Sequence, residues 1–350
     1  MPMNNTIPPK MEEIFTRTWS MATAAPLVGE QDYLPLKVDD LTCDVSLGFD
    51  LFMRIRMAGG NEAEMVIVCP RETPLPAELK KKIEQAGISL VYFHRRDLTQ
   101  VLSYLNDRLG EVLQEDSLTP VQKAQTVARV TVLWVRHFFT DASMQQEAYQ
   151  RIGFQYVDHL FGFLCRDSFH RAALTDLYQH EPNIYAHCLN CSLLSMAFAQ
   201  YLGWPENKIK DLGGGALLHD IGLTRVPQEI LSKMDMLSDE EWALITRHPS
   251  TGYGILKNFA SETLGVLSIV LQHHENCDGS GYPEGLKLTQ IHPMARVMRI
   301  VDSFEAMISQ RHWRAAFNPA HALQIMTREC KESNIFDKKL LISFIKFLSS

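Results

Sequence analysis

The arrangement of hydrophobic and polar positions along the chain changes after about residue 110. Before that point, residues 49–56 and 64–69 are two short runs in which apolar side chains partly alternate with polar ones, a pattern typical of half-buried strands. Between them, Gly59-Gly60-Asn61 is a sequence that favours a tight turn. The three segments together predict a β-hairpin.

More elements are predicted downstream of the hairpin. Residues 75–85 have the spacing of a helix that Gly87 would end, residues 88–93 resemble a strand, and another helix is predicted from Asp97 onward. Residues 31–110 therefore predict a small α/β module with a regulatory or sensory role. The polar, proline-containing residues 1–30 predict a flexible tail.

From residue 119 to the end, apolar residues recur every three or four positions, as they do in helices. Helix starts are indicated by Thr119-Pro120, by the capping box of Ser238 and Glu241, and by Asn318-Pro319. His248-Pro249 is expected to end the helix that begins at Ser238. We therefore expect an all-α region, with a helical linker at 119–180 and a helical domain at 181–350. Together with the N-terminal module, this makes the fold class α+β overall.

Charge and composition narrow the class of function. The 350 residues include 34 basic and 41 acidic side chains, a formal net charge of −7, so we expect no broad basic surface for long nucleic acids. No apolar run approaches the roughly 20 residues of a membrane span, and the N-terminus does not resemble a secretory signal. Seven cysteines, an odd number, do not indicate a disulfide framework. These features predict a cytoplasmic protein without a membrane span.

Histidines beside carboxylates are the most informative feature of the C-terminal region, which holds eight of the 13 histidines. His219-Asp220 follows an apolar helix end, and His273-His274 lies between an apolar helix and a loop-forming stretch. Burying a carboxylate beside imidazoles is unfavourable unless a cation compensates the charge. Several imidazoles and two carboxylates, the second from Asp302, exceed what one tetrahedral zinc needs, and they favour a pair of metals that share a bridging carboxylate.

These residues belong to a longer series of motifs in a fixed order. The series contains His219-Asp220-Ile221-Gly222, His248-Pro249, His273-His274-Glu275, Asp278-Gly279-Ser280-Gly281-Tyr282-Pro283 and Arg311-x-x-Arg314. In these motifs the chain resembles the HD-GYP family, a branch of the HD-domain metal-dependent phosphohydrolases. The resemblance covers roughly residues 185–348, nearly half of the chain.

The resemblance implies an all-α phosphodiesterase that hydrolyses cyclic di-GMP to linear pGpG, to GMP or to both, by a hydroxide that two metals activate. The catalytic residues would be Asp220 and His219. The metals would be divalent transition metals, with iron expected first and manganese second. One metal would be held by His187, His219, Asp220 and Asp302, and the other by Asp220, His248, His273 and His274, with Asp220 as the bridge.

The chain departs from the family pattern at two positions near this site. Leu223 stands where the family has a lysine close to the scissile phosphate, so we expect slow turnover unless Arg225 or Lys233 substitutes for it. Asn183 stands where some members have a glutamate that holds a third metal, so we expect two metals.

Contacts with a substrate or partner are also implied only by the resemblance. The candidates for contact with the cyclic dinucleotide are Tyr282, Glu305, Arg311 and Arg314. The Gly281-Tyr282-Pro283 loop is also a candidate contact for diguanylate cyclase domains, and the sequence does not decide between these roles. It also leaves open whether the chain forms a homodimer.

Two alternative functions remain open from the sequence alone. Because Leu223 replaces the lysine, the first alternative is a signalling protein that keeps its metals and binds a cyclic dinucleotide without hydrolysing it well. The second is a hydrolase for another cyclic dinucleotide or nucleotide. Two further motifs are interpreted as structural: Gly213-Gly214-Gly215 as a site of close helix packing, and Cys188 with Cys191 as core thiols.

Overall fold

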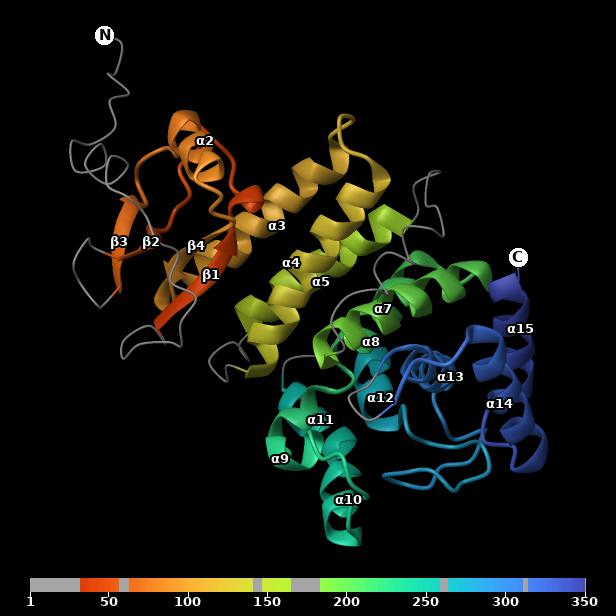
Figure 1. Ribbon diagram of the computed structural model, residues 1–350. Helices are drawn as coiled ribbons and strands as arrows, with labels where there is room; N and C mark the ends of the chain where they lie inside the picture. Colours follow the sequence, from red (N-terminus) through yellow and green to blue (C-terminus); the bar gives the residue numbers. More distant parts are fainter. Residues whose placement is uncertain are drawn as a thin grey trace. The chain divides into compact units, whose positions relative to one another are not determined.

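The structure is a computed structural model that describes residues 32–56, 63–140, 147–164, 183–258, 264–310 and 314–349 (Figure 1). The predicted tail at 1–30, the predicted turn at 59–61, part of the predicted linker, and Arg311 lie outside these ranges. The chain divides into two compact units, Met1–Glu111 and Val112–Ser350.

The first unit contains a four-stranded antiparallel sheet with the strand order β1-β4-β2-β3. The strands are β1 (Tyr33–Lys37), β2 (Leu51–Arg56), β3 (Ala63–Cys69) and β4 (Leu90–His94), and the helices are α2 (Ala77–Gln85) and α3 (Leu98–Gln114), whose last turn lies beyond the unit boundary. The predicted hairpin is confirmed, because β2 pairs antiparallel with β3. The predicted third strand and both predicted helices are observed as β4, α2 and α3.

Strand β1 was not predicted. It pairs with β4 from Tyr33 opposite His94 to Lys37 opposite Leu90, and it forms one edge of the sheet. Pro35 in its middle has no N–H to donate, which an edge strand tolerates but which makes the sequence look unlike a strand.

The second unit is helical throughout its described ranges, as predicted. Its helices are α4 (Pro120–Thr140), α5 (Glu147–Leu164), α7 (Ile184–Tyr201), α8 (Glu206–Leu218), α9 (Gln228–Leu231), α10 (Asp239–Ile245), α11 (His248–Leu256), α12 (Leu264–Gln272), α13 (Pro293–Ile308), α14 (Pro319–Glu332) and α15 (Lys338–Ser349). A short 3₁₀ turn, η5 (Ile221–Arg225), follows α8. None of the helices in the described ranges is long and apolar enough to cross a membrane.

Helix α7 is the central helix of this unit. Its residues from His187 to Ala199 are almost all buried, and it packs against α4, α5, α8, α13 and α15. A helix that is apolar on all sides is stable only when other helices surround it. This position explains why His187, near the start of α7, lies in the protein interior.

The predicted packing role of the triple glycine is confirmed. Gly213 and Gly215 are buried in α8, where an added Cβ would lie 2.4 Å from Met196 Sδ of α7 and 2.4 Å from Ile269 Cδ1 of α12, respectively. The absent side chains thus allow α8 to approach both neighbouring helices closely.

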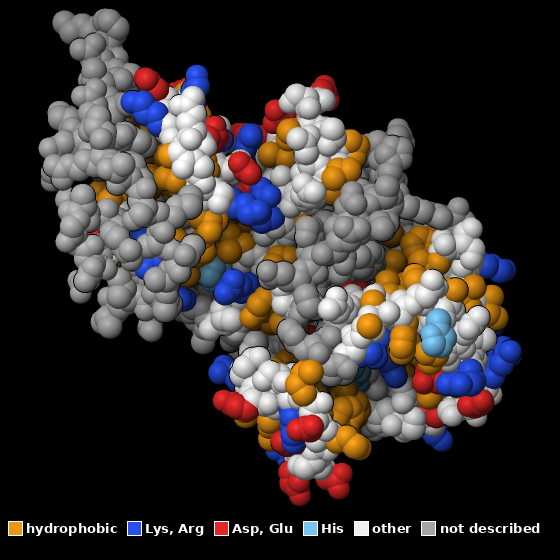
Figure 2. Space-filling view, viewed as in Figure 1, with side chains coloured by type: hydrophobic (Ala, Val, Ile, Leu, Met, Phe, Trp, Pro, Cys, Tyr) orange, Lys and Arg blue, Asp and Glu red, His pale blue; other side chains and the backbone are white. Residues whose placement is uncertain are grey.

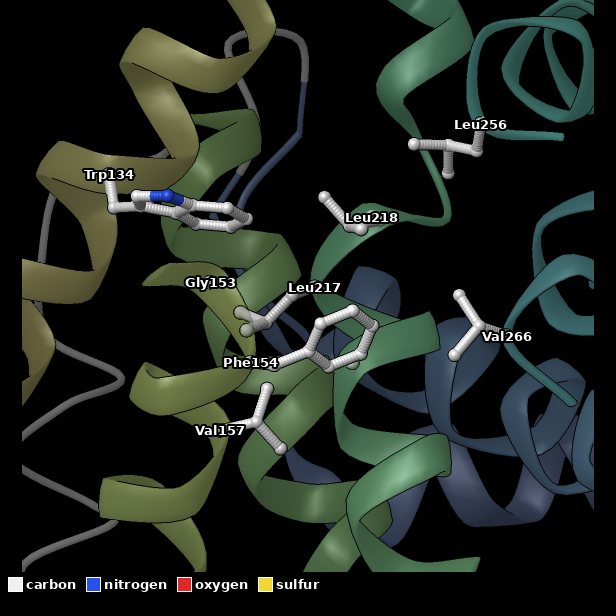
Figure 3. A pocket seen from close by; sticks show the side chains of 9 residues that line it. Trp134, Gly153, Phe154, Val157, Leu217, Leu218, Leu256 and Val266 are labelled. Carbon is white, nitrogen blue, oxygen red and sulfur yellow. The ribbon is translucent and has the colours of Figure 1, made fainter. Parts of the chain in front are cut away.

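Apolar packing also holds the C-terminal end of α8. Trp134 of α4 and Phe154 of α5 lie opposite Leu217 and Leu218 of α8 around an apolar cavity of about 20 Å³ (Figure 3). Helices α4 and α5, which lie within the segment predicted as a linker, therefore pack in the second unit. Helix α5 packs against α8, which precedes His219, and α4 packs against α7 and η5.

Candidate metal centre

The seven predicted metal ligands come from five parts of the helical unit and lie close together. The ligands are His187 on α7, His219 and Asp220 at the end of α8, His248 at the start of α11, His273 and His274 directly after α12, and Asp302 on α13. All are buried except His274, which is partly exposed. Potential ligand atoms form three groups, and within each group they lie within 4.8 Å of one another. Two of the groups contain these seven residues, and the third joins Cys188 to His219 and Asp220.

One local prediction about these elements was wrong. His248-Pro249 does not end the helix that begins after Ser238, because that helix, α10, already ends at Ile245. His248 instead begins α11, with Pro249 in its first turn, where the missing N–H costs nothing. The ligand therefore lies at a helix start.

Asp220 lies at the centre of the site. Its Oδ2 is 3.3 Å from His219 Nε2 and 3.8 Å from His187 Nε2. Its Oδ1 is 3.2 Å from His248 Nε2 and 3.7 Å from His273 Nε2. The two carboxylate oxygens thus face two different pairs of imidazoles, which is the geometry that a bridging carboxylate requires.

The backbone fixes which nitrogen of three imidazoles faces the centre. Nδ1 of His219 lies 2.8 Å from Ala216 O, Nδ1 of His248 lies 2.8 Å from Ile245 O, and Nδ1 of His273 lies 3.0 Å from Val270 O. Because a carbonyl oxygen can only accept, each Nδ1 must donate its proton. In the neutral imidazoles Nε2 therefore presents a lone pair to the centre, as a metal ligand does.

This arrangement lacks positive charge unless cations or protons occupy it. The Nε2 atoms of His248 and His273 are 3.0 Å apart, and Nε2 of the fully buried His219 has no hydrogen-bond partner. Lone pairs that face one another and a carboxylate repel unless a cation lies between them. The donor set of imidazoles and carboxylates fits divalent transition metals better than magnesium.

Charges within the site shift the pKa values of the histidines in opposite directions. Burial lowers the pKa of His187 and of His219, but their neighbours outweigh burial and raise both pKa values well above the ordinary value. These neighbours are Cys191, Glu305 and Asp302 at His187, and Asp220 and Cys188 at His219. Burial dominates at His273, whose pKa falls to about 4, and at His274, whose pKa is also well below its ordinary value. Burial would raise the pKa values of Asp220 and Asp302, but the neighbouring imidazoles hold both below their ordinary range.

Metal uptake should therefore release protons at neutral pH. At pH 7 the metal-free site holds protons on His187 and His219, whereas His273 and His274 are already neutral. A metal must displace the first two, so we expect release of about two protons per chain and weaker metal affinity as the pH falls from 8 to 6. Calorimetric titration of metal into metal-free protein, in buffers of different ionisation enthalpy, measures this number.

The same shifts predict how the stability of the metal-free protein depends on pH. Because the folded-state pKa values of His187 and His219 are raised, their stabilising contribution is complete below the unfolded value of about 6.5 and is lost as the pH rises through the folded values.

Both predictions depend on protons at His187 and His219. Metal uptake at pH 7 without proton release would therefore contradict this assignment of charge.

Glu305 is not placed to contact a substrate, contrary to the prediction. It is fully buried on α13, its Oε2 pairs with Nδ1 of His187, and its Oε1 accepts hydrogen bonds from Asn190 Nδ2 at 2.9 Å and from Ser309 Oγ at 2.6 Å. Although burial would raise its pKa, His187 and these hydrogen bonds hold that pKa below its ordinary value. Glu305 thus orients His187 from behind, as carboxylates commonly do for metal-binding histidines.

We expect Glu305→Gln to weaken metal binding about 10- to 100-fold. The glutamine Oε1 must still accept from Asn190 and Ser309, so its NH₂ group faces Nδ1 of His187. His187 then has to accept at Nδ1 and carry its proton on Nε2, where it blocks the metal. Competition with a chelator measures the affinity, and Glu332→Gln, at an exposed position of α14, is the matched control. Equal affinities of the two variants would show that Glu305 does not set the tautomer.

A cysteine also reaches this cluster, which sequence reasoning did not anticipate. Cys191 and Cys188 are buried thiols, as predicted, but Cys191 Sγ lies 3.7 Å from His187 Nδ1 and groups with His187, His219 and Asp302. Burial raises the pKa of Cys191 to about 12. Its spacing of four residues from His187 on one helix was the available signal, since such residues share a helix face.

The loop after His274 is held against the site by Glu275. This buried carboxylate accepts hydrogen bonds from the backbone N–H groups of Glu284 at 2.7 Å and Leu286 at 2.9 Å. Within the loop, the ring of Tyr282 stacks on His274 with a centroid distance of 4.8 Å. Tyr282 therefore lies beside the metal ligands, where a substrate contact was predicted.

Two arginines were also predicted to contact the substrate, and the structure describes only Arg314. Arg314 donates hydrogen bonds to the carbonyl oxygens of Ala306 and Met307 near the end of α13, and its guanidinium lies over Phe317, so its donors are engaged within the fold. Arg311 lies outside the described residues. The described part of the structure does not bring Arg314 to the predicted metal ligands.

The structure also shows what surrounds the positions that depart from the family pattern and the residues proposed to replace the missing lysine. Asn183 caps α7 by accepting hydrogen bonds from the N–H groups of Tyr185 and Ala186, so its side-chain oxygen is already used. Lys233 forms an ion pair with Glu241 at 2.6 Å. Leu223 and the exposed Arg225 line a groove of about 320 Å³ beside η5.

Known proteins are similar to the part of the chain that contains this site. Residues 172–340 match the HD domain family. A cyclic di-GMP phosphodiesterase of Pseudomonas aeruginosa is 32% identical over 208 residues, which are 59% of this chain and 50% of that protein. A 3′3′-cGAMP-specific phosphodiesterase of Vibrio cholerae is 31% identical over 157 residues, which are 44% of this chain and 36% of that protein.

A solved structure shares the fold. An HDG"Y"P protein from Bdellovibrio bacteriovorus superposes with a TM-score of 0.63 at 20% identity, covering 91% of this chain and all of that one. The chain spans about half or less of the length of the curated relatives named above. Residues 172–340, just under half of the chain, are therefore similar to the HD domain family, and the chain shares its fold with an HDG"Y"P protein.

Proposed function

We propose that this protein is a metal-dependent phosphodiesterase that hydrolyses cyclic di-GMP, with linear pGpG, GMP or both as product. The observation that carries the proposal is the position of Asp220, whose two oxygens face separate pairs of imidazole Nε2 atoms. The names of the relatives, which include cyclic di-GMP phosphodiesterases, support the substrate class.

We assign two metals to the site, iron before manganese. His187, His219 and Asp302 would hold one, His248, His273 and His274 the other, and Asp220 would contact both. When bound, such metals supply Lewis acidity that lowers the pKa of water and polarises phosphoryl oxygens. The capping role of Asn183 supports two metals rather than three, because its oxygen is engaged by backbone N–H groups.

The protein's own residues orient the reacting groups. The carbonyl partners of His219, His248 and His273, and Glu305 behind His187, fix Nδ1 as the donor, so that Nε2 offers its lone pair to a metal once the imidazole is neutral. The burial of these side chains excludes bulk water, which strengthens every charge interaction in the site.

The decisive experiment is turnover by protein of known metal content. The chain is loaded anaerobically with Fe(II) or Mn(II), analysed for metal, and incubated with cyclic di-GMP, 3′3′-cGAMP and cyclic di-AMP. We expect hydrolysis of cyclic di-GMP to linear dinucleotide, and faster hydrolysis of another member of the panel would change the assigned substrate. A preparation with two metals per chain that hydrolyses none of them would overturn the proposal.

A second candidate function is binding of a cyclic dinucleotide with little turnover. The groove beside η5 has Leu223 where a cation is expected, and the exposed Arg225 also lines it. Lys233, the other candidate replacement, pairs with Glu241. Micromolar binding without hydrolysis in the same experiment would favour this candidate. Contact of the Gly281-Tyr282-Pro283 loop with diguanylate cyclase domains stays a prediction, as do dimerisation and a cytoplasmic location.

A further inference from the structure

An aromatic surface leads from the metal centre to the solvent. Tyr282 stacks on His274 with a centroid distance of 4.8 Å, and the indole of Trp242 on α10 meets Tyr282 edge-on at 6.3 Å and 81°. These two contacts place the indole centre within about 11 Å of the His274 ring. Trp242 is 51% exposed. One end of this surface is therefore a candidate metal ligand, and the other is free to contact a molecule from solution.

The two outer rings are held in place without being covered. The backbone of the Tyr282 loop is bound by Glu275, and an added Cβ on Gly281 would lie 2.3 Å from Asn276 N, so the loop is tightly packed. Helix α10 starts with a capping box between Ser238 and Glu241, and Glu241 also pairs with Lys233. A ring pair fixed in this way loses little conformational freedom when a ligand stacks on it.

The exposure of Trp242 is not explained by packing. By comparison, Trp134 is almost fully buried in the helical core. Acidic side chains gather over α10 in Figure 2, with hydrophobic ones beside them, and the first turn of that helix carries Asp239, Glu240 and Glu241. These acidic side chains repel phosphate. A neutral, flat, aromatic group of a ligand therefore suits the Trp242 end of the surface.

We propose that Trp242 and Tyr282 form a stacking site for a purine base of the nucleotide whose phosphate lies at the metal centre. The proposal rests on the proposed function, because it takes the phosphate to be bound by the metals. In a nucleotide the sugar separates phosphate from base, so a phosphate at the metals and a base on the rings can be held together. Stacking on an indole needs only a π-face, so this site recognises a base as such.

Two small probes that share a phosphate test the proposal directly. GMP and ribose 5-phosphate both carry a 5′-phosphate, but only GMP has a base. We measure their binding to Mn(II)-loaded wild type, Trp242→Ala and Trp242→Phe by calorimetry. We expect Trp242→Ala to weaken GMP binding about tenfold and to leave ribose 5-phosphate binding unchanged, while Trp242→Phe keeps most of the GMP affinity.

Met236→Ala is the matched control. Met236 is 93% exposed near the same end of the unit, so its removal tests whether any exposed apolar side chain here matters. The proposed stacking site is disproved if Trp242→Ala weakens the binding of GMP and of ribose 5-phosphate equally. It is also disproved if Trp242→Ala changes GMP binding no more than Met236→Ala does. Loss of capture of a partner protein by Trp242→Ala, with GMP binding intact, would assign the surface to protein docking instead.

Hydrolysis by the wild type separates this inference from the proposed function. If cyclic di-GMP is hydrolysed, Trp242→Ala should raise KM about tenfold with little change in kcat, since a base stacked equally in ground and transition states contributes uniform binding. If GMP binding depends on the base but no cyclic di-GMP is hydrolysed, the proposed function is wrong and the proposed stacking site still stands. Hydrolysis with an unchanged KM in Trp242→Ala would overturn the stacking site alone.

Discussion

Asp220→Asn should abolish turnover, by at least about 10³-fold, and should remove metal from the protein. Four imidazole Nε2 atoms lie within 3.8 Å of the two Asp220 oxygens. The amide has no negative charge, and its NH₂ group can donate to the Nε2 atoms on one side of the site. Hydrogen bonds then replace the cation on that side. Elemental analysis and the cyclic di-GMP assay on one preparation measure both effects.

The matched control for this variant lies on the same helix. Asp211 of α8 is a surface carboxylate that pairs with Lys208 at 3.8 Å, so Asp211→Asn removes the same charge away from the site. We expect it to keep wild-type metal content and activity, because exposed ion pairs contribute little. If Asp220→Asn retained both metals and more than a tenth of the activity, Asp220 would not be a bridging ligand.

The sequence predicted which residues gather at the candidate metal centre, but not which residues support them. The ligands stand out because His219-Asp220 and His273-His274 are adjacent pairs next to apolar runs. The role of Glu305 depends on the packing of α7 against α13, which brings together residues 118 positions apart. Glu305 lies three residues after Asp302 on α13, so the two side chains share one face of the helix. This spacing does not show whether Glu305 contacts a histidine or a substrate.

The fold was predictable where the local pattern agrees with the final burial. The β2–β3 hairpin and α4 follow from alternation and from Thr119-Pro120, because each element shows its buried face in its own sequence. Strand β1 was not predicted because it is an edge strand that contains Pro35. Its pairing with β4, rather than the hydrophobic pattern of its own residues, makes it a strand. The start of α11 at His248 was missed because α10 ends at Ile245, only three residues earlier, and α11 is fixed by packing against η5 and α12 rather than by its own pattern.

Gly222→Ala should destabilise the helical unit by about 3 kcal/mol, with a fall in Tm of roughly 10 °C. An added Cβ would lie 1.9 Å from the carbonyl oxygen of His248 and 2.8 Å from the backbone nitrogen of Gly252. Both atoms belong to the backbone of α11, which cannot change rotamer to make room. The turn η5 and helix α11 must therefore move apart, and Asp220 and His248 move with them.

The matched control for this variant is Gly254→Ala, in the same helix α11. Nothing lies within 4 Å of a Cβ at Gly254, so alanine there should leave Tm unchanged or raise it slightly through its better helix propensity. Thermal unfolding of both metal-free variants separates a steric effect from a general cost of replacing glycine. Because the strain falls between two ligands, Gly222→Ala should also lower metal affinity, and a variant with normal Tm and normal metal affinity would show that η5 and α11 are not held in close contact.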